Sequence, residues 1–408
     1  MNRLEELIEE LCPDGVEYVS LGEICNLITK GTTPKTYEKE GITFIKTEAI
    51  EDVNLNKEKL VYVSNETHEG FLKRSKLEEN DILFAIAGSI GKCIVVSKNM
   101  LPANTNQALA IIRLKENVEV KYVYHTLQSN FMTNYILKSV KGSAQPNLNL
   151  KQMNDFLFPL PPLEVQREIV RILDNFTELT AELTAELTAR KKQYEYYRDN
   201  LLSFDGKNVE WKKLEEISRD MYRGAGIKRD QVTEEGIPCV RYGEIYTSYD
   251  IRFKECKSHT NEKEIQSKKY FEYGDILFTI TGESVEEIAK SIVYLGNDKC
   301  LAGGDVVVMK HNQNPRYLSY ALSTTSAQMQ KSKGKVKSKV VHSSVPALKE
   351  ILVPIPSLEE QERIANILDK FHELCNNISE GLPAEIEARR KQYEYYRDKL
   401  LTFKELGA

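Results

Sequence analysis

Two long segments of the chain carry apolar residues at the spacing of a coiled-coil helix. In the first segment the apolar positions advance in steps of four, three, four, three and four residues: Val165, Ile169, Ile172, Phe176, Leu179 and Leu183. About 40 helical residues at ~1.5 Å each would form a rod of about 60 Å. Two Thr-Ala-Glu-Leu tetrads, ending at Leu183 and Leu187, impose a four-residue step that acts as a stutter in the heptad pattern.

The second helical segment has the same pattern with an interruption. Gly381-Leu382-Pro383 predicts a break or kink near its middle, because proline removes a helical hydrogen bond. The segments around these helices alternate short β-rich runs with an amphipathic helix, which indicates mixed α/β globules. The expected strands and helices are Ile42–Lys46, Ile82–Ala87, Cys93–Val96, Ala108–Arg113 and a helix over Val120–Lys138, then Ile276–Ile280, Ser291–Tyr294, Val306–Lys310 and a helix from about Arg316.

The chain is a tandem duplication of globule and helix. Arg190–Phe204 and Arg389–Phe403 are identical at twelve of fifteen positions, and Pro159–Phe176 pairs with Pro354–Phe371. We therefore predict an α+β protein with two mixed α/β domains in tandem, separated by long helices that form an antiparallel coiled coil with a pseudo-twofold internal repeat. The predicted domains are residues 1–158, with an N-terminal helix, 159–204 as a central helical spacer, 205–353, and 354–408 as a C-terminal helical spacer.

Charge is segregated along the chain. The net charge of −5 argues superficially against a nucleic-acid partner, since phosphate binding relies on Lys and Arg. The stretches Val306–Lys349 and Val120–Asn154, however, contain no Asp or Glu and several lysines. Acids gather at the N-terminus and in the helical segments, so some faces are suited to phosphate and others to protein.

Composition gives a second set of expectations. Seven dispersed cysteines and six isolated histidines favour a reduced, cytoplasmic protein over a disulfide framework or a zinc site. The acidic, amphipathic start predicts a helix rather than a signal peptide, and no apolar run is long enough to span a bilayer. Motifs for covalent DNA chemistry are missing: Gly88–Lys92 is too short for a Walker A loop, and Asn314-Pro315-Arg316-Tyr317 has Arg where a methyltransferase signature has proline.

The duplicated layout resembles the specificity subunits of type I restriction-modification systems over essentially the whole chain. The resemblance is carried by the LPPLEVQREI and IPSLEEQERI blocks, the two KQYEYYRDxLL blocks, Lys30–Pro34, Ile45–Glu48 and Gly142–Gln145. It implies that each globule is a target recognition domain for one half of a split, asymmetric DNA site. It also implies that the helices set the gap and bind two methyltransferase subunits, that motor-nuclease subunits join for restriction, and that S-adenosylmethionine, ATP and magnesium are held by those partners.

The second globule departs from this pattern. Gly224–Ile227 replaces the G-T-T-P stretch, and we align Val341–Ser344 with G-S-A-Q. Divergent globules beside nearly identical helices suit two different DNA readers on a scaffold for identical partners. An alternative is that the helices kept their sequence only to pair with each other. Aromatics on several helix faces favour partner contact, at Tyr194, Tyr196, Tyr197, Tyr393, Tyr395 and Tyr396.

Polar and basic loop residues are the candidates for DNA contact. In the first globule they are Lys30, Thr32, Thr33, Lys46, Thr47, Ser143, Gln145 and Asn147; in the second they are Arg223, Lys228, Arg241, Tyr242, Lys335, Lys337, Lys339 and Ser343. Arg241 is suited to bidentate hydrogen bonds with guanine, and Gln145 is suited to bidentate hydrogen bonds with adenine. The alternating lysines are suited to contacts with phosphate. A merely solvated lysine-rich loop is the alternative for Lys331–Lys339. For the whole chain the rivals are a stand-alone DNA-modifying or DNA-cutting enzyme, and a coiled-coil adaptor without DNA binding.

Overall fold

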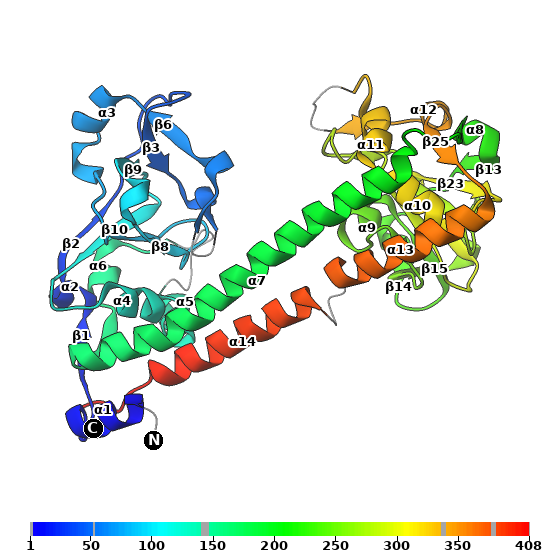
Figure 1. The fold of residues 1–408 in the computed structure, drawn as a ribbon. Coiled ribbons are helices and arrows are strands. Elements are labelled where there is room, and N and C mark those ends of the chain that lie inside the picture. The colour runs from blue at the N-terminus through cyan, green and yellow to red at the C-terminus, as the bar shows by residue number, and fades with distance from the viewer. Residues whose placement is uncertain (1–2, 52–53, 140–146, 336–339, 377–380, 408) are drawn as a thin grey trace. The chain divides into compact units, whose positions relative to one another are not determined.

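The computed structural model describes residues 3–51, 54–139, 147–335, 340–376 and 381–407, and it divides into two compact units (Figure 1). Unit 1 comprises Met1–Leu183 and Glu385–Ala408; unit 2 comprises Thr184–Ala384. Each unit contains one globule and parts of the long helices. Each therefore draws on both copies of the duplicated sequence.

The globule of unit 1 is built on two sheets. The larger is antiparallel and has the order β2 (Cys25–Lys30), β10 (Leu109–Leu114), β7 (Ile82–Ala85), β8 (Cys93–Val95). In the smaller, β3 (Ile42–Ile45) lies between antiparallel β6 (Val61–Val63) and parallel β9 (Ala103–Thr105). Strands β4 (Ile50–Glu51) and β5 (Asn54–Leu55) form a separate antiparallel pair. Alternate β7 residues enter different cores, because strand side chains point to opposite faces: Ile82 and Phe84 pack with the helices, Leu83 and Ala85 with the other side.

Helices cover one face of the larger sheet in unit 1. They are α1 (Arg3–Leu11), α2 (Leu21–Ile24), α4 (Val120–Leu127), α5 (Asn130–Ser139) and α6 (Leu150–Asn154), with α3 (Asn65–Glu69) in the smaller subdomain. The chain enters and leaves the globule through β1 (Glu17–Ser20) and β11 (Leu157–Leu160), which pair antiparallel. The two ends of the globule are thus hydrogen-bonded neighbours.

Unit 2 repeats this plan with additional edge strands. Its first sheet has the order β13 (Ser218–Arg223), β23 (Val306–His311), β19 (Ile276–Thr279), β21 (Ser291–Tyr294), β16 (Arg252–Phe253). Its second has β14 (Val232–Thr233), β17 (Ser258–Thr260), β15 (Ile237–Val240), β22 (Cys300–Ala302), β18 (Tyr270–Phe271). Two strand pairs complete the β-structure, β12 (Glu210–Lys213) with β25 (Leu352–Ile355) and β20 (Thr281–Gly282) with β24 (Val341–His342). The helices of this globule are α8 (Leu214–Ile217), α9 (Tyr242–Thr247), α10 (Pro315–Ser323), α11 (Thr325–Ser332) and α12 (Val345–Lys349).

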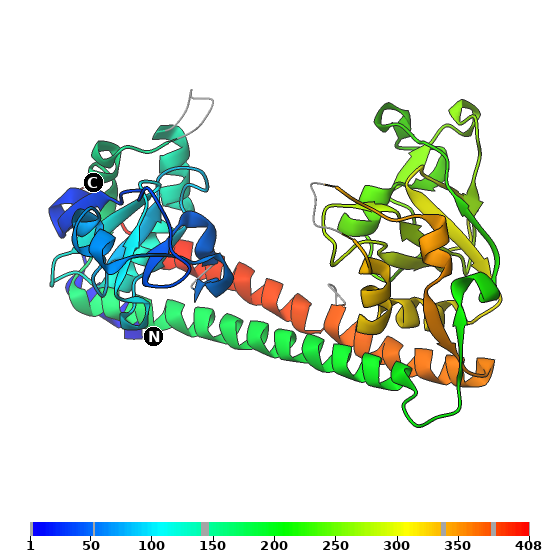
Figure 2. The ribbon, with the colours of Figure 1, turned by 90° about the horizontal axis from the view of Figure 1, so that it is seen from above.

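The long helices exchange partners between the two copies. Helix α7 (Leu163–Ser203) packs against α14 (Leu382–Leu400) within unit 1, where Phe176 stacks on Tyr396 at 5.3 Å between ring centroids. Within unit 2 the same helix packs against α13 (Leu358–Asn376), where Tyr197 stacks on Phe371 at 5.8 Å (Figures 1 and 2). In both places the phenylalanine that ends one copy's ILD-x-F block meets a tyrosine of the other copy's YEYY block.

Most expectations about the fold are confirmed. The expected strands match β3, β7, β8, β10, β19, β21 and β23, and the helical interruption lies between α13 and α14, with residues 377–380 outside the described part. The single helix over Val120–Lys138 is wrong: α4 and α5 are separate, because the Ser129 hydroxyl accepts the Met132 N–H at 3.2 Å and starts a new helix. Val165 and Ile169 are fully buried and belong to the core of the globule. The thiols of six cysteines are free, namely Cys12, Cys25, Cys93, Cys239, Cys256 and Cys300.

Candidate nucleic-acid interface

In unit 1, hydrogen bonds gather the ends of three strands at one edge of the globule. The N–H of Gly31, after β2, donates to the Leu109 carbonyl at 3.1 Å. The N–H of Thr32 donates to the Thr105 carbonyl at 3.0 Å, at the end of β9. The Thr105 hydroxyl donates to the carbonyl of Ile45, the last residue of β3, at 2.8 Å. The turns after β2, β3 and β9 therefore lie together.

Two further segments join this edge. The N–H of Ile86 donates to the Ala108 carbonyl at 2.9 Å, and the N–H of Leu148 donates to the Ile86 carbonyl at 2.9 Å. We call the assembled segments the turn cluster of unit 1: residues 30–33, 46–47, 86–87, 106–108 and 147–148.

The corresponding bonds recur in unit 2. They run from Gly224 N–H to Val306 (2.7 Å), Ala225 N–H to Ala302 (3.0 Å), Ile280 N–H to Asp305 (3.0 Å) and Ser343 N–H to Ile280 (2.9 Å). The Gly303 N–H also donates to the carbonyl of Val240, at the end of β15, at 2.8 Å. The turn cluster of unit 2 is residues 223–226, 241–242, 280–281, 303–305 and 342–343. Two globules with divergent sequences thus assemble the same group of turns.

These bonds correct our alignment of the second globule. Ser343 occupies the place of Leu148, so Val341–Ser344 matches residues 146–149 instead of the G-S-A-Q stretch at 142–145. The helix caps agree: the side chain of Ser344 accepts the Ala347 N–H, as the side chain of Asn149 accepts the Gln152 N–H. Small polar residues alone do not set this alignment, whereas the helix caps at Ser344 and Asn149 do.

A glycine is required at the first turn of each cluster. A Cβ on Gly31 would lie 2.1 Å from the Thr105 carbonyl oxygen, and one on Gly224 would lie 2.2 Å from the Gly303 carbonyl oxygen. Both contacts are with backbone, which cannot move aside as a side chain would. The glycine of the K-G-T-T-P motif therefore allows the turns to pack closely, and its neighbours carry the surface chemistry.

Six of the eight predicted DNA-contact residues in the first globule belong to the turn cluster of unit 1, namely Lys30, Thr32, Thr33, Lys46, Thr47 and Asn147. Lys30, Thr33 and Asn147 are exposed. The Lys46 amine lies 4.4 Å from the centre of the Tyr37 ring and 3.7 Å from Glu48, and the hydroxyl of Thr47 is buried with no partner among the described residues. Ser143 and Gln145 lie outside the described residues.

In unit 2 the two arginines of the cluster are held by carboxylates. Arg223 donates from Nε to the Gly304 carbonyl and forms an ion pair with Asp305. Arg241 donates to Glu244 through Nε at 3.3 Å and Nη2 at 3.1 Å, and the same carboxylate accepts the Ser258 hydroxyl at 2.5 Å. Glu244 therefore fixes one edge of the Arg241 guanidinium and leaves Nη1 for another acceptor. Tyr242 is exposed beside it.

Of the other predicted residues of the second globule, Ser343 belongs to the turn cluster, where its N–H donates to the Ile280 carbonyl at 2.9 Å. Lys228 is exposed four residues beyond Gly224, and the half-buried Lys335 follows α11, so both lie outside the residues of the cluster. Lys337 and Lys339 lie outside the described residues. The alternative of a solvated lysine-rich loop is wrong for Lys331, because its amine is buried and donates to Ser291 Oγ at 3.0 Å and to the Leu322 carbonyl at 2.8 Å. Burial lowers the pKa of Lys331 to about 7.

Sequence reasoning missed the turns that complete the two clusters. Asn106 and Gln107 lie in unit 1, and Gly303, Gly304 and Asp305 occupy the equivalent turn of unit 2. The sequence signal that marks them is a run of turn-forming residues before the buried strands β10 and β23.

The six tyrosines divide into three matched pairs. Tyr194 and Tyr393 are turned inward: Tyr194 packs against His372, and the Tyr393 hydroxyl lies 2.8 Å from His125 Nδ1. Tyr197 and Tyr396 cover the helix seam, as described above. Tyr196 and Tyr395 are 67% and 62% exposed, so they offer the largest aromatic surface to another molecule.

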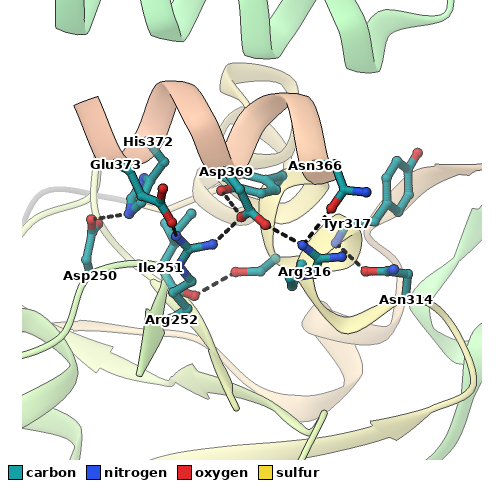
Figure 3. Close-up of polar contacts among 12 residues, drawn as sticks. Asp250, Ile251, Arg252, Asn314, Arg316, Tyr317, Asn366, Asp369, His372 and Glu373 are labelled. Atoms are coloured by element: carbon teal, nitrogen blue, oxygen red, sulfur yellow. Dashed lines mark hydrogen bonds and ion pairs between the residues drawn. The ribbon is translucent and has the colours of Figure 1, made fainter. Parts of the chain in front are cut away.

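In each unit one carboxylate of a long helix is shared by several side chains of the globule. In unit 2, Asp369 of α13 pairs with Arg252 and Arg316 and accepts the Tyr320 hydroxyl at 2.7 Å (Figure 3). In unit 1, Asp174 of α7 pairs with Lys121 at 2.5 Å and lies 3.2 Å from His125 Nε2. Burial lowers the pKa of His125, although Asp174 opposes the shift.

The comparisons with known proteins agree with this duplicated architecture. The chain matches the family described as "Type I restriction modification DNA specificity domain" over residues 13–190 and again over 207–388. It is 32% identical to a type I restriction enzyme specificity subunit of Escherichia coli, covering 99% of this chain and 97% of that protein. It is 29% identical to a putative type I restriction enzyme specificity subunit of Haemophilus influenzae, covering 98% of both.

The chain therefore belongs to the type I restriction-modification specificity family and carries two copies of its DNA specificity domain. A solved structure from a study of type I restriction-modification complex assembly shares the fold, with a TM-score of 0.62 at 19% identity over 96% of this chain and 98% of that one. Among the described residues, no group of three or more His, Cys, Asp or Glu side chains could hold a metal ion. Within those same residues no helix is long and apolar enough to cross a membrane.

Proposed function

We propose that this chain is the DNA-recognition subunit of a type I restriction-modification complex and performs no covalent chemistry itself. Each unit would read one half of a bipartite, asymmetric DNA site through its turn cluster. The observation that supports this most directly is the recurrence of one hydrogen-bonded group of turns, carrying different side chains, in the two globules. Conserved geometry with changed surface chemistry is what two readers of different sequences require.

Arg241 is the strongest candidate for base recognition in unit 2. Glu244 holds its Nε and Nη2, so the guanidinium is oriented before DNA arrives and the loss of side-chain entropy on binding is reduced. The end of the fork that carries Nη1 and Nη2 can donate two bonds to O6 and N7 of a guanine in the major groove. Lys30 of unit 1, exposed on the turn that corresponds to that of Arg223, suits phosphate.

The exposed tyrosines indicate where protein partners would bind. Tyr196 and Tyr395, with Tyr197 and Tyr396 beside them, form two similar aromatic surfaces on the helices. Two similar surfaces suit two identical methyltransferase subunits, with motor-nuclease subunits joining for restriction. S-adenosylmethionine, ATP and magnesium would then be held by those partners, in the cytoplasm.

Selection of DNA from a random library tests this proposal. The chain is purified with the methyltransferase subunit of its own system, and the bound DNA is sequenced. We expect two different half-sites separated by a fixed gap of unspecified sequence. Recovery of one continuous site, or of a palindrome, would contradict the proposal.

The same material separates the two rival functions. Methylation or cleavage of DNA by this chain without any partner subunit would favour a stand-alone enzyme. Binding that is independent of DNA sequence and of salt concentration would favour a coiled-coil adaptor, because binding to phosphate releases counterions and must weaken as salt rises.

A further inference from the structure

The turn between β9 and β10 lies in the middle of the turn cluster of unit 1. The Thr105 carbonyl, before the turn, accepts from Thr32, and the Ala108 carbonyl, after it, accepts from Ile86. Both ends of the turn are thus fixed to neighbouring segments. The two residues between them, Asn106 and Gln107, are carried on a backbone with little freedom to move.

These two residues use their amides differently. The Asn106 side-chain oxygen accepts the Ala108 N–H at 3.1 Å, and the Asn106 carbonyl accepts the Leu109 N–H at 3.2 Å, so Asn106 shapes the turn. Gln107 is exposed, and its side chain makes no hydrogen bond to any residue that the structure describes. Gln107 is therefore the residue whose polar group this turn presents to a ligand.

Unit 2 has a turn of the same length without that group. Gly304 takes the place of Gln107, and a Cβ there would lie 3.1 Å from the Cα of Gly226. The guanidinium of Arg223 donates to the Gly304 carbonyl and pairs with Asp305, the next residue. In unit 1 this position therefore carries an exposed side-chain amide. In unit 2 it is a glycine, and Arg223 is bonded to its carbonyl and to the next residue.

We propose that Gln107 is a specificity-determining residue of unit 1 and recognises an adenine in the major groove. This inference rests on the proposed function and deepens it. An amide offers both a donor and an acceptor, which match N7 and the N6 amino group of adenine, whereas a phosphate only accepts. Lys30 and Lys46, on the neighbouring turns, provide the positive charge that holds the phosphates.

Binding measurements on point variants test this assignment. The chain is purified with its methyltransferase subunit, and affinity is measured for the selected site and for every single base-pair change in both half-sites. For Gln107→Ala we expect the preference for adenine to fall about 5- to 150-fold at one base pair of one half-site. For Gln107→Glu we expect the preference at that base pair to move toward cytosine, whose N4 amino group donates to a carboxylate.

Lys30→Ala provides the matched control on the adjacent turn. It should weaken binding to all sequences alike and make the salt dependence shallower by about one ion. Arg241→Ala identifies the half-site that unit 2 reads. Because Gln107 lies in unit 1, the folded Gln107 variants should keep the wild-type base preference at that half-site.

Three results would overturn the assignment of Gln107. They are uniform weakening across all sequences in Gln107→Ala, an unchanged base preference, or a change in the half-site that Arg241→Ala affects. If the wild-type complex selects no bipartite site, the proposed function itself is refuted. Failure of the Gln107 assignment can therefore be distinguished from failure of the proposed function.

Discussion

Replacing Asp369 with asparagine should loosen the globule of unit 2 from its helix. The Asp369 carboxylate is 15% exposed and pairs with Arg252 and Arg316, whose side chains are 23% and 25% exposed (Figure 3). Asparagine keeps the shape and one acceptor for the Tyr320 hydroxyl but removes the charge. Two guanidinium groups would then lose the carboxylate that they share.

The size of the effect follows from this partial burial. Removing one partner of a buried ion pair costs about 3–5 kcal/mol, whereas an exposed pair is worth about 0–1 kcal/mol. Arg316 keeps its contact with Glu362, and Arg252 keeps one with Glu373 at 3.5 Å. We therefore expect a loss of about 2–3 kcal/mol, equivalent to about a 30- to 150-fold change in the local opening equilibrium.

Hydrogen exchange measures that opening directly. The amides of α10, which carries Arg316 and Tyr320, should exchange about 30- to 150-fold faster in Asp369→Asn, while unit 1 is unchanged. The matched control is Asp174→Asn in unit 1, where Lys121 is 52% exposed and the expected loss is only about 1 kcal/mol. Equal small effects of the two variants, or faster exchange throughout both units, would refute the reasoning.

Three further predictions follow from particular residues. Burial lowers the pKa of His311 to about 4, so the unfolded state binds more protons than the folded state below pH 6.5. The free energy of unfolding of unit 2 should therefore fall by up to about 3 kcal/mol between pH 6.5 and 4. In His311→Gln, equilibrium unfolding should show that this part of the pH dependence is gone. Deleting Thr184–Leu187 shortens α7 by about 6 Å and should change the gap in selected DNA by one or two base pairs at ~3.4 Å each, leaving the half-sites unchanged; an unchanged gap would exclude α7 as the ruler. Lys335→Ala combined with Lys337→Ala should weaken binding at all sequences and make its salt dependence shallower, whereas a change at a single base pair would show a base-reading role.

The sequence predicts the parts of the fold that depend on local pattern. The repeated KQYEYYRD blocks and the heptad steps indicate two copies of a helical seam, and the structure has it, with Phe176 and Phe371 stacked on tyrosines. The central strands β7 and β19 were also predicted, since short apolar runs that are buried on both faces stand out in the chain.

The candidate site was predicted only in part, because its geometry depends on contacts between distant segments. Lys331 belongs to an acid-free, lysine-rich run that resembles a solvated loop, but α11 turns its amine toward Ser291 and Leu322. Arg223 was predicted to contact DNA, and Asp305 pairs with it from 82 residues away. Gln107 has no local motif at all and gains its position from bonds made by Thr105 and Ala108.

Exchange of one globule tests most directly the claim that the two units read DNA independently. Residues 21–156 can be replaced by the corresponding segment of another family member, because the Leu21 N–H donates to the Phe156 carbonyl at 2.7 Å and the paired strands β1 and β11 remain intact at the junction. DNA selected by the chimera with its methyltransferase subunit should have one new half-site, one original half-site and the original gap. If both half-sites change together, or neither changes, two independent readers are not present in this chain.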